Sequence, residues 1–173
     1  MIEIIDDLFP PKLVSRGFYY LETYPNWDFL ADSPDSSEAY TLGKCFENDD
    51  YEDIAKEFMS YMDRQDFKRV LYNAFQSSDC PKPHVDSQSP KGFTYMIYLN
   101  PDWDVSMAGE TIFVDEPTGE IIKSVVPKRG RLVKFTSEIP HSARPPLRDA
   151  MRKRYSMVFQ THPIGLETLG DLL

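Results

Sequence analysis

Short β-rich runs in the second half of the chain, each followed by turn-forming residues, constrain the fold more than any other feature. Proline and glycine recur between these runs at intervals of roughly ten residues, and such spacing is typical of an antiparallel sandwich or barrel. We therefore predict a jelly-roll core, a double-stranded β-helix, over residues 67–162. The predicted strands are Phe67–Phe75, Phe93–Leu99, Glu110–Val114, Ile121–Val126, Arg131–Phe135 and Tyr155–Gln160.

The first part of the chain has helical patterns instead. Pro10 and Pro11 suit the first turn of a helix. From Tyr51 to Met62 apolar residues recur at spacings of three and four residues, which indicates an amphipathic helix. We expect an α+β fold in which N-terminal helices, within residues 8–65, pack on the outside of the jelly roll. A short strand is expected at 2–5, a surface loop at 31–38, and a short helix or frayed tail at 166–173.

Length and composition fit one globular domain spanning residues 1–173, because 41% of the residues are hydrophobic and 27% are charged. The apolar runs are too short to cross a bilayer, and the acidic N-terminus does not resemble a secretory signal. Cys45 and Cys80 give no disulfide framework. These features predict a cytoplasmic protein with no membrane partner, whereas the oligomeric state has no sequence signal.

The formal net charge of −9 argues against a nucleic-acid partner. The charge is unevenly distributed, because Lys128–Arg154 holds nine basic and only two acidic residues. Two interpretations stay open at this point. The segment forms a solvated face that balances an acidic body, or it contains an anion site.

Three histidines are present, and one of them belongs to a His-x-Asp pair, His84 and Asp86. Residues two apart on an extended segment face the same side, so these side chains form two potential metal ligands. His141 follows a predicted strand and provides a third. Two histidines and one carboxylate are typical of non-haem Fe(II) oxygenases, although zinc and metal-free roles are alternatives. No role is predicted for His162.

Arg154 begins the last predicted strand. It is either a surface charge at a strand end or a guanidinium that faces the interior. A buried guanidinium is costly without an anion, and its planar fork matches a carboxylate in two parallel hydrogen bonds. A dicarboxylate cosubstrate would supply such an anion.

The sequence resembles the 2-oxoglutarate- and Fe(II)-dependent oxygenases, and within them the prolyl 4-hydroxylase-like branch. The resemblance covers roughly residues 69–162. Its motifs, in family order, are His84-x-Asp86, Tyr98-Leu99-Asn100-Pro101-Asp102-Trp103, Gly109-Glu110-Thr111, the strand from Val126 to Phe135, His141, and Arg154 directly before Tyr155-Ser156.

The resemblance implies a role for each of these positions. His84, Asp86 and His141 would bind Fe(II), and Arg154 would bind the distal carboxylate of 2-oxoglutarate. The cosubstrate pocket would be completed by Tyr98, Tyr72 and Thr111, or the two tyrosines would be ordinary core aromatics.

The sequence departs from the pattern of this branch at two places. Ala108 replaces a common glycine, and the longer gap before Arg154 leaves Arg152 as a rival for the carboxylate. The nucleic-acid dealkylating branch typically has a second arginine where this chain has Gln160.

The activity that the resemblance implies is hydroxylation of a C–H bond, using O2 and releasing succinate and CO2, with ascorbate as an accessory reductant. A prolyl residue in a peptide or protein is the expected substrate. A free amino acid, a small metabolite and a catalytically silent binding domain are the alternatives. The segments 76–91 and 101–108 are long enough to act as lids. Aromatic residues at Tyr24, Trp27, Phe29 and Trp103 form either a peptide groove or part of the core.

Overall fold

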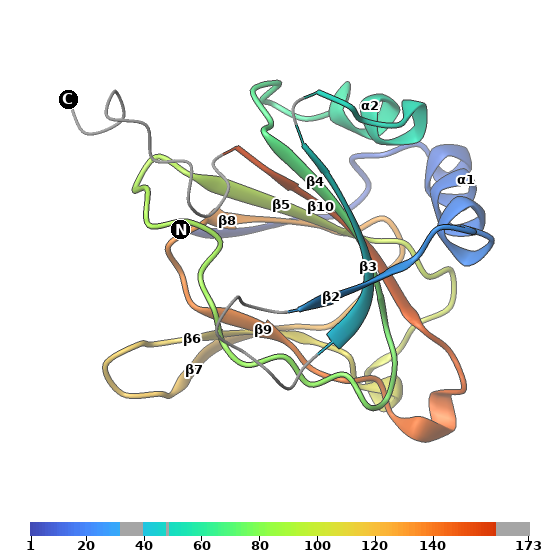
Figure 1. The fold of residues 1–173 in the computed structure, drawn as a ribbon. Helices are drawn as coiled ribbons and strands as arrows, with labels where there is room; N and C mark the ends of the chain where they lie inside the picture. The colour runs from blue at the N-terminus through green and yellow to red at the C-terminus, as the bar shows by residue number, and fades with distance from the viewer. Residues whose placement is uncertain (32–39, 48, 162–173) are drawn as a thin grey trace.

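The computed structural model describes residues 1–31, 40–47 and 49–161, and these form two antiparallel β-sheets that face each other (Figure 1). The larger sheet has the strand order β1-β8-β5-β10-β4-β3-β2, and the smaller has the order β7-β6-β9. Most of the predicted 31–38 loop, His162 and the 166–173 segment lie outside the described residues. The predicted antiparallel jelly-roll architecture is present.

The strand bounds follow the predicted runs closely after residue 67. The larger sheet comprises β1 (Ile2–Ile5), β2 (Asp28–Ala31), β3 (Tyr40–Glu47), β4 (Arg69–Phe75), β5 (Phe93–Tyr98), β8 (Leu132–Thr136) and β10 (Arg154–Gln160). The smaller comprises β6 (Thr111–Val114), β7 (Ile121–Val125) and β9 (His141–Ala143). Strands β2, β3 and β9 were not among the predicted runs. Because β2 and β3 lie within residues 8–65, this segment is not purely helical.

Two α-helices, α1 (Pro11–Glu22) and α2 (Asp53–Met59), lie beside the larger sheet on the side away from the smaller one (Figure 1). Pro11 occupies the first turn of α1, where its missing N–H costs no hydrogen bond. Gly17 allows α1 to approach α2, because a Cβ there would lie 2.8 Å from Cε2 of Phe58. Two short 3-10 helices, η1 (Val105–Met107) and η2 (Arg148–Ala150), lie in the loops before β6 and β10.

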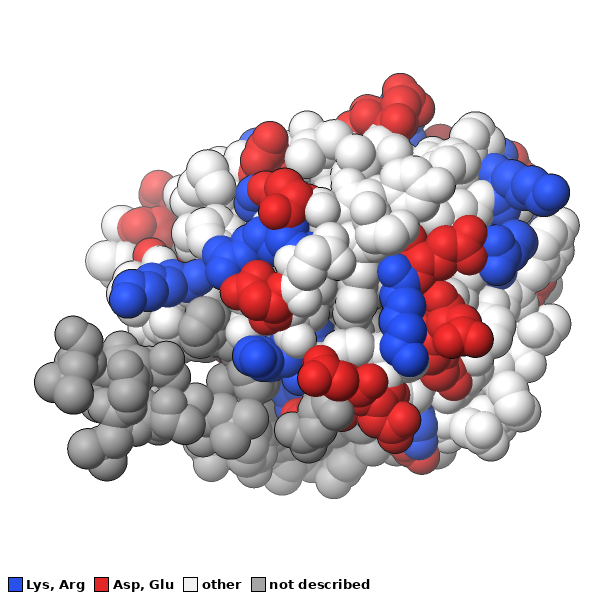
Figure 2. All heavy atoms as spheres, turned by 90° about the horizontal axis from the view of Figure 1, so that it is seen from above, with Lys and Arg blue, Asp and Glu red and all other residues white. Residues whose placement is uncertain are grey.

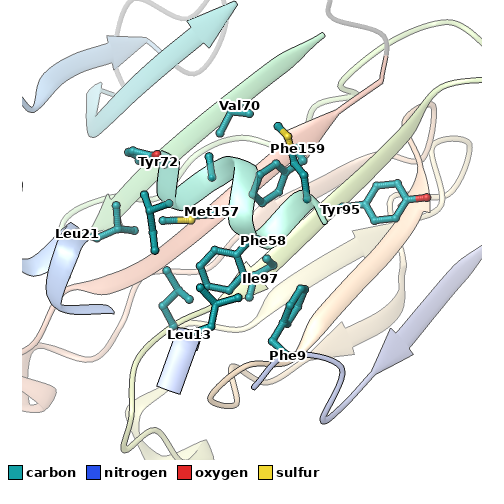
Figure 3. Close-up of a cluster of buried hydrophobic side chains, with 14 of the residues drawn as sticks. Phe9, Leu13, Leu21, Phe58, Val70, Tyr72, Tyr95, Ile97, Met157 and Phe159 are labelled. Atoms are coloured by element: carbon teal, nitrogen blue, oxygen red, sulfur yellow. The ribbon is translucent and has the colours of Figure 1, made fainter. Parts of the chain in front are cut away.

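The main apolar core lies between these helices and the larger sheet (Figure 3). Successive residues of a strand face opposite sides, so Val70, Tyr72 and Ala74 of β4 are buried in this core. Arg69, Leu71 and Asn73 alternate with them and face the smaller sheet. The interior between the two sheets is therefore available for a site.

Several basic residues of the 128–154 segment pair with acids from elsewhere in the chain. Asp6 accepts from both Lys128 and Arg131 at 2.8 Å, and Lys134 lies 2.5 Å from Asp63. Acidic and basic side chains are interspersed on the face drawn in Figure 2. For these residues the charge-balancing interpretation fits. No helix within the described ranges is long and apolar enough to cross a membrane.

Candidate metal centre and its cavity

The fold brings His84, Asp86 and His141 together. One potential ligand atom from each lies within 4.8 Å of the others. His84 and His141 form an antiparallel β-bridge, with His84 N–H donating to the carbonyl of His141 at 3.0 Å and the reverse bond at 2.9 Å. This bridge attaches the 84–86 segment to the edge of the smaller sheet beside β9, so two of the three residues have fixed backbone positions.

The carboxylate of Asp86 lies between the two imidazoles. Its Oδ1 is 3.8 Å from Nε2 of His84, and its Oδ2 is 3.5 Å from Nε2 of His141. Thr94 of β5 donates its hydroxyl to Oδ2 at 2.5 Å, and the backbone N–H of Asp86 donates to Ser137 at 2.9 Å. Asp86 is 5% exposed, so its orientation is set by the protein rather than by water.

Both histidines have the arrangement that metal ligation requires. Nδ1 of His84 lies 3.1 Å from the carbonyl of Lys82, and Nδ1 of His141 lies 2.9 Å from the carbonyl of Ile139. A carbonyl can only accept, so Nδ1 carries a proton in each ring, and Nε2 is the nitrogen that faces Asp86. Burial lowers the pKa of His141, and the nearby carboxylate of Asp86 opposes this shift in part. A donor set of two imidazoles with one carboxylate fits a divalent transition metal such as Fe(II).

Arg154 is fully buried, and its guanidinium faces the same cavity. Nη2 donates to the hydroxyl of Thr111 at 2.8 Å, whereas Nε and Nη1 have no hydrogen-bond partner among the described residues. The guanidinium lies over the rings of Phe75 and Tyr98, 5.2 and 4.8 Å from their centroids. No carboxylate of the described residues pairs with it, and a buried, unbalanced guanidinium with free donors is suited to bind an anion.

The rival Arg152 is placed differently. Its side chain is 51% exposed and lies 3.9 Å from Asp102. Arg154 is therefore the arginine of this pair that lines the cavity. Gly109 makes room for it, because a Cβ at Gly109 would lie 3.3 Å from Cδ of Arg154 and 3.0 Å from the ring of Trp103.

Tyr98 and Thr111 both lie beside Arg154. The Tyr98 hydroxyl donates to Oγ1 of Thr111 at 2.7 Å, so this oxygen is contacted by both Tyr98 and Arg154. Thr111 lies two residues along β6 from Phe113, which pairs with His141. On β6, the residue that contacts Arg154 and the residue that pairs with His141 are thus separated by roughly 7 Å of strand.

Tyr72 is not brought to this cavity. It faces the helices and packs among Met157, Tyr24 and the other core side chains (Figure 3). The reason is strand alternation: Tyr72 pairs with Met157 of β10, whereas Asn73 pairs with Ser156, and only the latter pair lines the cavity. The prediction that Tyr72 lines the cosubstrate pocket is therefore wrong.

Several polar side chains that face the cavity were not predicted from the sequence. Its volume is about 220 Å³, and β4, β5, β6, β9 and β10 all contribute to its wall. Ser156 and Gln160 follow Arg154 at even spacing on β10, so alternation along that strand was the available signal. The missed polar residues are Asn73, Thr94, Ser156, Gln160, Arg69 and Cys45.

The aromatic residues considered for a groove have other positions. Tyr24 and Trp27 belong to the apolar core or pack against it. Nε1 of Trp103 donates to the carbonyl of Ala108 at 2.8 Å, which fixes the loop before β6. The side chain of Phe29 lies outside what the structure describes.

Comparisons with known proteins agree with this arrangement. The sequence profile of the 2OG-Fe(II) oxygenase superfamily matches residues 70–162. No curated protein matches the chain. Among solved structures, a prolyl-4-hydroxylase from Pseudomonas putida is 16% identical with a TM-score of 0.73, covering 92% of this chain and 91% of that one.

Two further structures are similar at the level of the fold. A Trichoplax adhaerens prolyl hydroxylase, in complex with a hypoxia inducible factor peptide fragment, is 16% identical with a TM-score of 0.66, covering 92% of this chain and 82% of that one. A 2OG-Fe(II) oxygenase family oxidoreductase from Burkholderia pseudomallei is 15% identical with a TM-score of 0.64, covering 94% and 86%. Since the family profile spans more than half of the sequence, this chain belongs to the 2OG-Fe(II) oxygenase superfamily.

Proposed function

We propose that residues 1–173 form one oxygenase domain that hydroxylates a C–H bond of a prolyl residue in a peptide or protein, consuming 2-oxoglutarate and O2 and releasing succinate and CO2. The observation that carries the proposal is the shared cavity. It holds the His84, Asp86 and His141 cluster together with the buried, unpaired guanidinium of Arg154. A metal site and a carboxylate site in one enclosure fit a diacid cosubstrate.

In this proposal His84, Asp86 and His141 hold Fe(II), which supplies the oxidising chemistry with 2-oxoglutarate and O2 when bound. The protein contributes orientation. The Lys82 and Ile139 carbonyls fix the imidazoles, so that their Nε2 atoms are available as ligands. Thr94 performs the corresponding task for Asp86, since its hydroxyl occupies one lone pair of Oδ2.

Arg154 binds the distal carboxylate of 2-oxoglutarate through its guanidinium, whose Nε and Nη1 have no hydrogen-bond partner within the described chain. Ser156, the next residue of β10 on the same face, has a buried hydroxyl with no partner in the described part of the chain, and it can donate to the same carboxylate. Thr111 and Tyr98 are positioning residues, because their hydroxyls support Nη2 of Arg154 rather than the cavity centre.

A peptide substrate is supported by the resemblance of the motifs to prolyl hydroxylases and by the peptide in the complex of the Trichoplax adhaerens structure. His84 is the more exposed metal-binding candidate, at 29% of its side chain, so the cavity opens beside it. Substrate would enter there, while the rest of the cavity wall excludes water from the reacting atoms. Ascorbate would act as an accessory reductant.

The test is succinate release by the purified protein with Fe(II), ascorbate and 2-oxoglutarate, followed by mass spectrometry of proline-containing peptides and free proline for one added oxygen. Asp86→Ala is expected to abolish succinate release and to leave a folded domain with unchanged circular dichroism. Succinate release by the folded variant at the wild-type rate would refute the ligand assignment. No succinate from the wild type would favour a silent binding domain.

A further inference from the structure

We propose that Arg69 and Gln160 form a substrate-binding pair at the metal end of the cavity, and that this pair binds a backbone amide next to the hydroxylated residue. The inference rests on the proposed function and assigns the substrate class to particular side chains. Gln160 would accept from the amide N–H, and Arg69 would donate to an amide carbonyl.

The register of the larger sheet places this pair. Gln160 of β10 is opposite Arg69 on β4 and opposite Thr94 on β5. Side chains of directly opposed residues in antiparallel strands lie on the same face with Cβ atoms about 5 Å apart. Thr94 itself donates to Asp86, so Gln160 lies beside the residue that holds the metal-binding carboxylate, and Arg69 lies one strand farther from it.

The same register separates the pair from the proposed 2-oxoglutarate anchor. Arg154 and Gln160 are at opposite ends of β10 and six residues apart, a backbone distance of roughly 20 Å. Ser156 and Val158 line the cavity between them. The anchor and this pair therefore bind different molecules.

The polar atoms of the pair are not satisfied by the protein. Gln160 is 3% exposed, faces the cavity, and its Oε1 has no hydrogen-bond partner within the described chain. A buried carbonyl oxygen without a donor is costly, so an incoming N–H group gains a bond that the free protein lacks. The side chain of Arg69 is 25% exposed, which places it at the cavity opening.

The charge around Arg69 favours a neutral acceptor. Its Nε donates to Oε1 of Glu47 at 3.1 Å, and this carboxylate balances the guanidinium charge. A guanidinium has five N–H donors, so others are available for a second acceptor. A free amino acid would bring a second carboxylate to an arginine already paired with one, whereas a peptide carbonyl adds no charge. The pair therefore selects a peptide amide over a free amino acid.

The experiment uses competition between matched peptides. Wild-type protein is given an equimolar mixture of three peptide pools. The first pool is acetyl-X-Pro-X-amide with both termini blocked. The second and third carry an N-methyl group on the backbone nitrogen of the residue before proline or of the residue after proline. Mass spectrometry measures the hydroxylated fraction of each, and the ratio gives relative kcat/KM. We expect the wild type to favour the unmethylated peptides over one of the two N-methylated pools by at least tenfold in kcat/KM. In Gln160→Met, which keeps a side chain of similar length without an acceptor, the ratio should fall to near one.

Two comparisons separate this from a structural effect. Arg69→Met should raise the KM for N–H peptides at least tenfold while the KM for 2-oxoglutarate is unchanged. Asn73→Ala, at a cavity position opposite Ser156 and without a predicted role, should keep the wild-type peptide ratio. Circular dichroism and peptide-independent succinate release check that each variant folds and binds 2-oxoglutarate.

An unchanged ratio in Gln160→Met, or a wild type without preference for N–H peptides, would overturn the inference. Hydroxylation of free proline but not of peptides would also overturn it, while succinate release would keep the oxygenase assignment. Absence of succinate release under every condition would instead mean that the proposed function itself fails.

Discussion

Replacing Arg154 by methionine is expected to stabilise the ligand-free protein and to abolish its response to 2-oxoglutarate. The variant keeps most of the side-chain volume and removes a fully buried charge that has no carboxylate partner in the described part of the chain. Buried charges are often replaced by apolar side chains without loss of stability, whereas removal of one member of a satisfied buried pair is strongly destabilising. The sign of the change in unfolding free energy therefore shows whether the guanidinium lacks an anionic partner in the ligand-free protein.

The magnitude follows from the contacts of the guanidinium. Nε and Nη1 are buried without acceptors, and each unsatisfied donor costs about 2 kcal/mol. The variant loses the hydrogen bond from Nη2 to Thr111, about 2 kcal/mol for a charged donor. It also loses the stacking on Phe75 and Tyr98, about 2 kcal/mol for each ring because the cation is desolvated, while removal of the buried charge itself recovers about 3 kcal/mol of desolvation cost. The balance favours the variant by about 1 kcal/mol, a rise in Tm of roughly 2–4 °C for a chain of this length.

The assay is thermal unfolding with Mn(II) in place of iron, with and without 2-oxoglutarate. At a ligand concentration of one hundred times Kd the wild type gains about 2.7 kcal/mol, and the variant should gain almost nothing. The two proteins therefore exchange order: the variant unfolds at the higher temperature without ligand, and the wild type does so with ligand. A variant destabilised by about 3 kcal/mol or more without ligand would refute the reasoning, because it would mean that Arg154 already has an anionic partner.

Three further predictions concern stability. Ala108→Gly should stabilise the protein by about 1 kcal/mol in urea unfolding, because Ala108 has a φ of 55° that glycine adopts without strain; a loss of stability would contradict this. Gly17→Ala should destabilise by roughly 1–2 kcal/mol despite its better helix propensity, because the new Cβ meets the ring of Phe58 at 2.8 Å. Asp6→Asn should cost roughly 1 kcal/mol at pH 7. Hydrogen bonds led by Arg131 lower the pKa of Asp6 from 3.8, so the difference between wild type and Asp6→Asn should shrink as the pH falls below that value, and a constant difference would argue against the ion pair.

The strands of the jelly roll were predictable wherever local pattern and turn residues agree. The predicted run Phe93–Leu99 is the strand Phe93–Tyr98, for example. Strand β9 is only three residues long, and its identity depends on pairing with β6 and with His84. Strands β2 and β3 complete the edge of the larger sheet through pairing with β4. Such long-range pairing leaves little trace in local sequence.

In the candidate site, too, local spacing was predictable from the sequence and long-range pairing was not. Residues two apart on one strand share a face, so the approach of His84 to Asp86 could be expected from their spacing alone. Tyr72 was misplaced because its spacing to His84 crosses a loop, and only the pairing of β4 with β10 decides which residues face inward. Thr94 required the same register information, whereas Gln160 shares a face of β10 with Arg154 by alternation.

The central claim is that one cavity binds a divalent metal at one end and a diacid at the other. A crystal structure of the protein grown with Mn(II) and 2-oxoglutarate under nitrogen, with anomalous scattering used to locate the metal, tests it most directly. The account predicts a metal peak bounded by Nε2 of His84, Nε2 of His141 and the carboxylate of Asp86, with the far carboxylate of 2-oxoglutarate on Arg154. A metal bound elsewhere, or a diacid that does not touch Arg154, would contradict it.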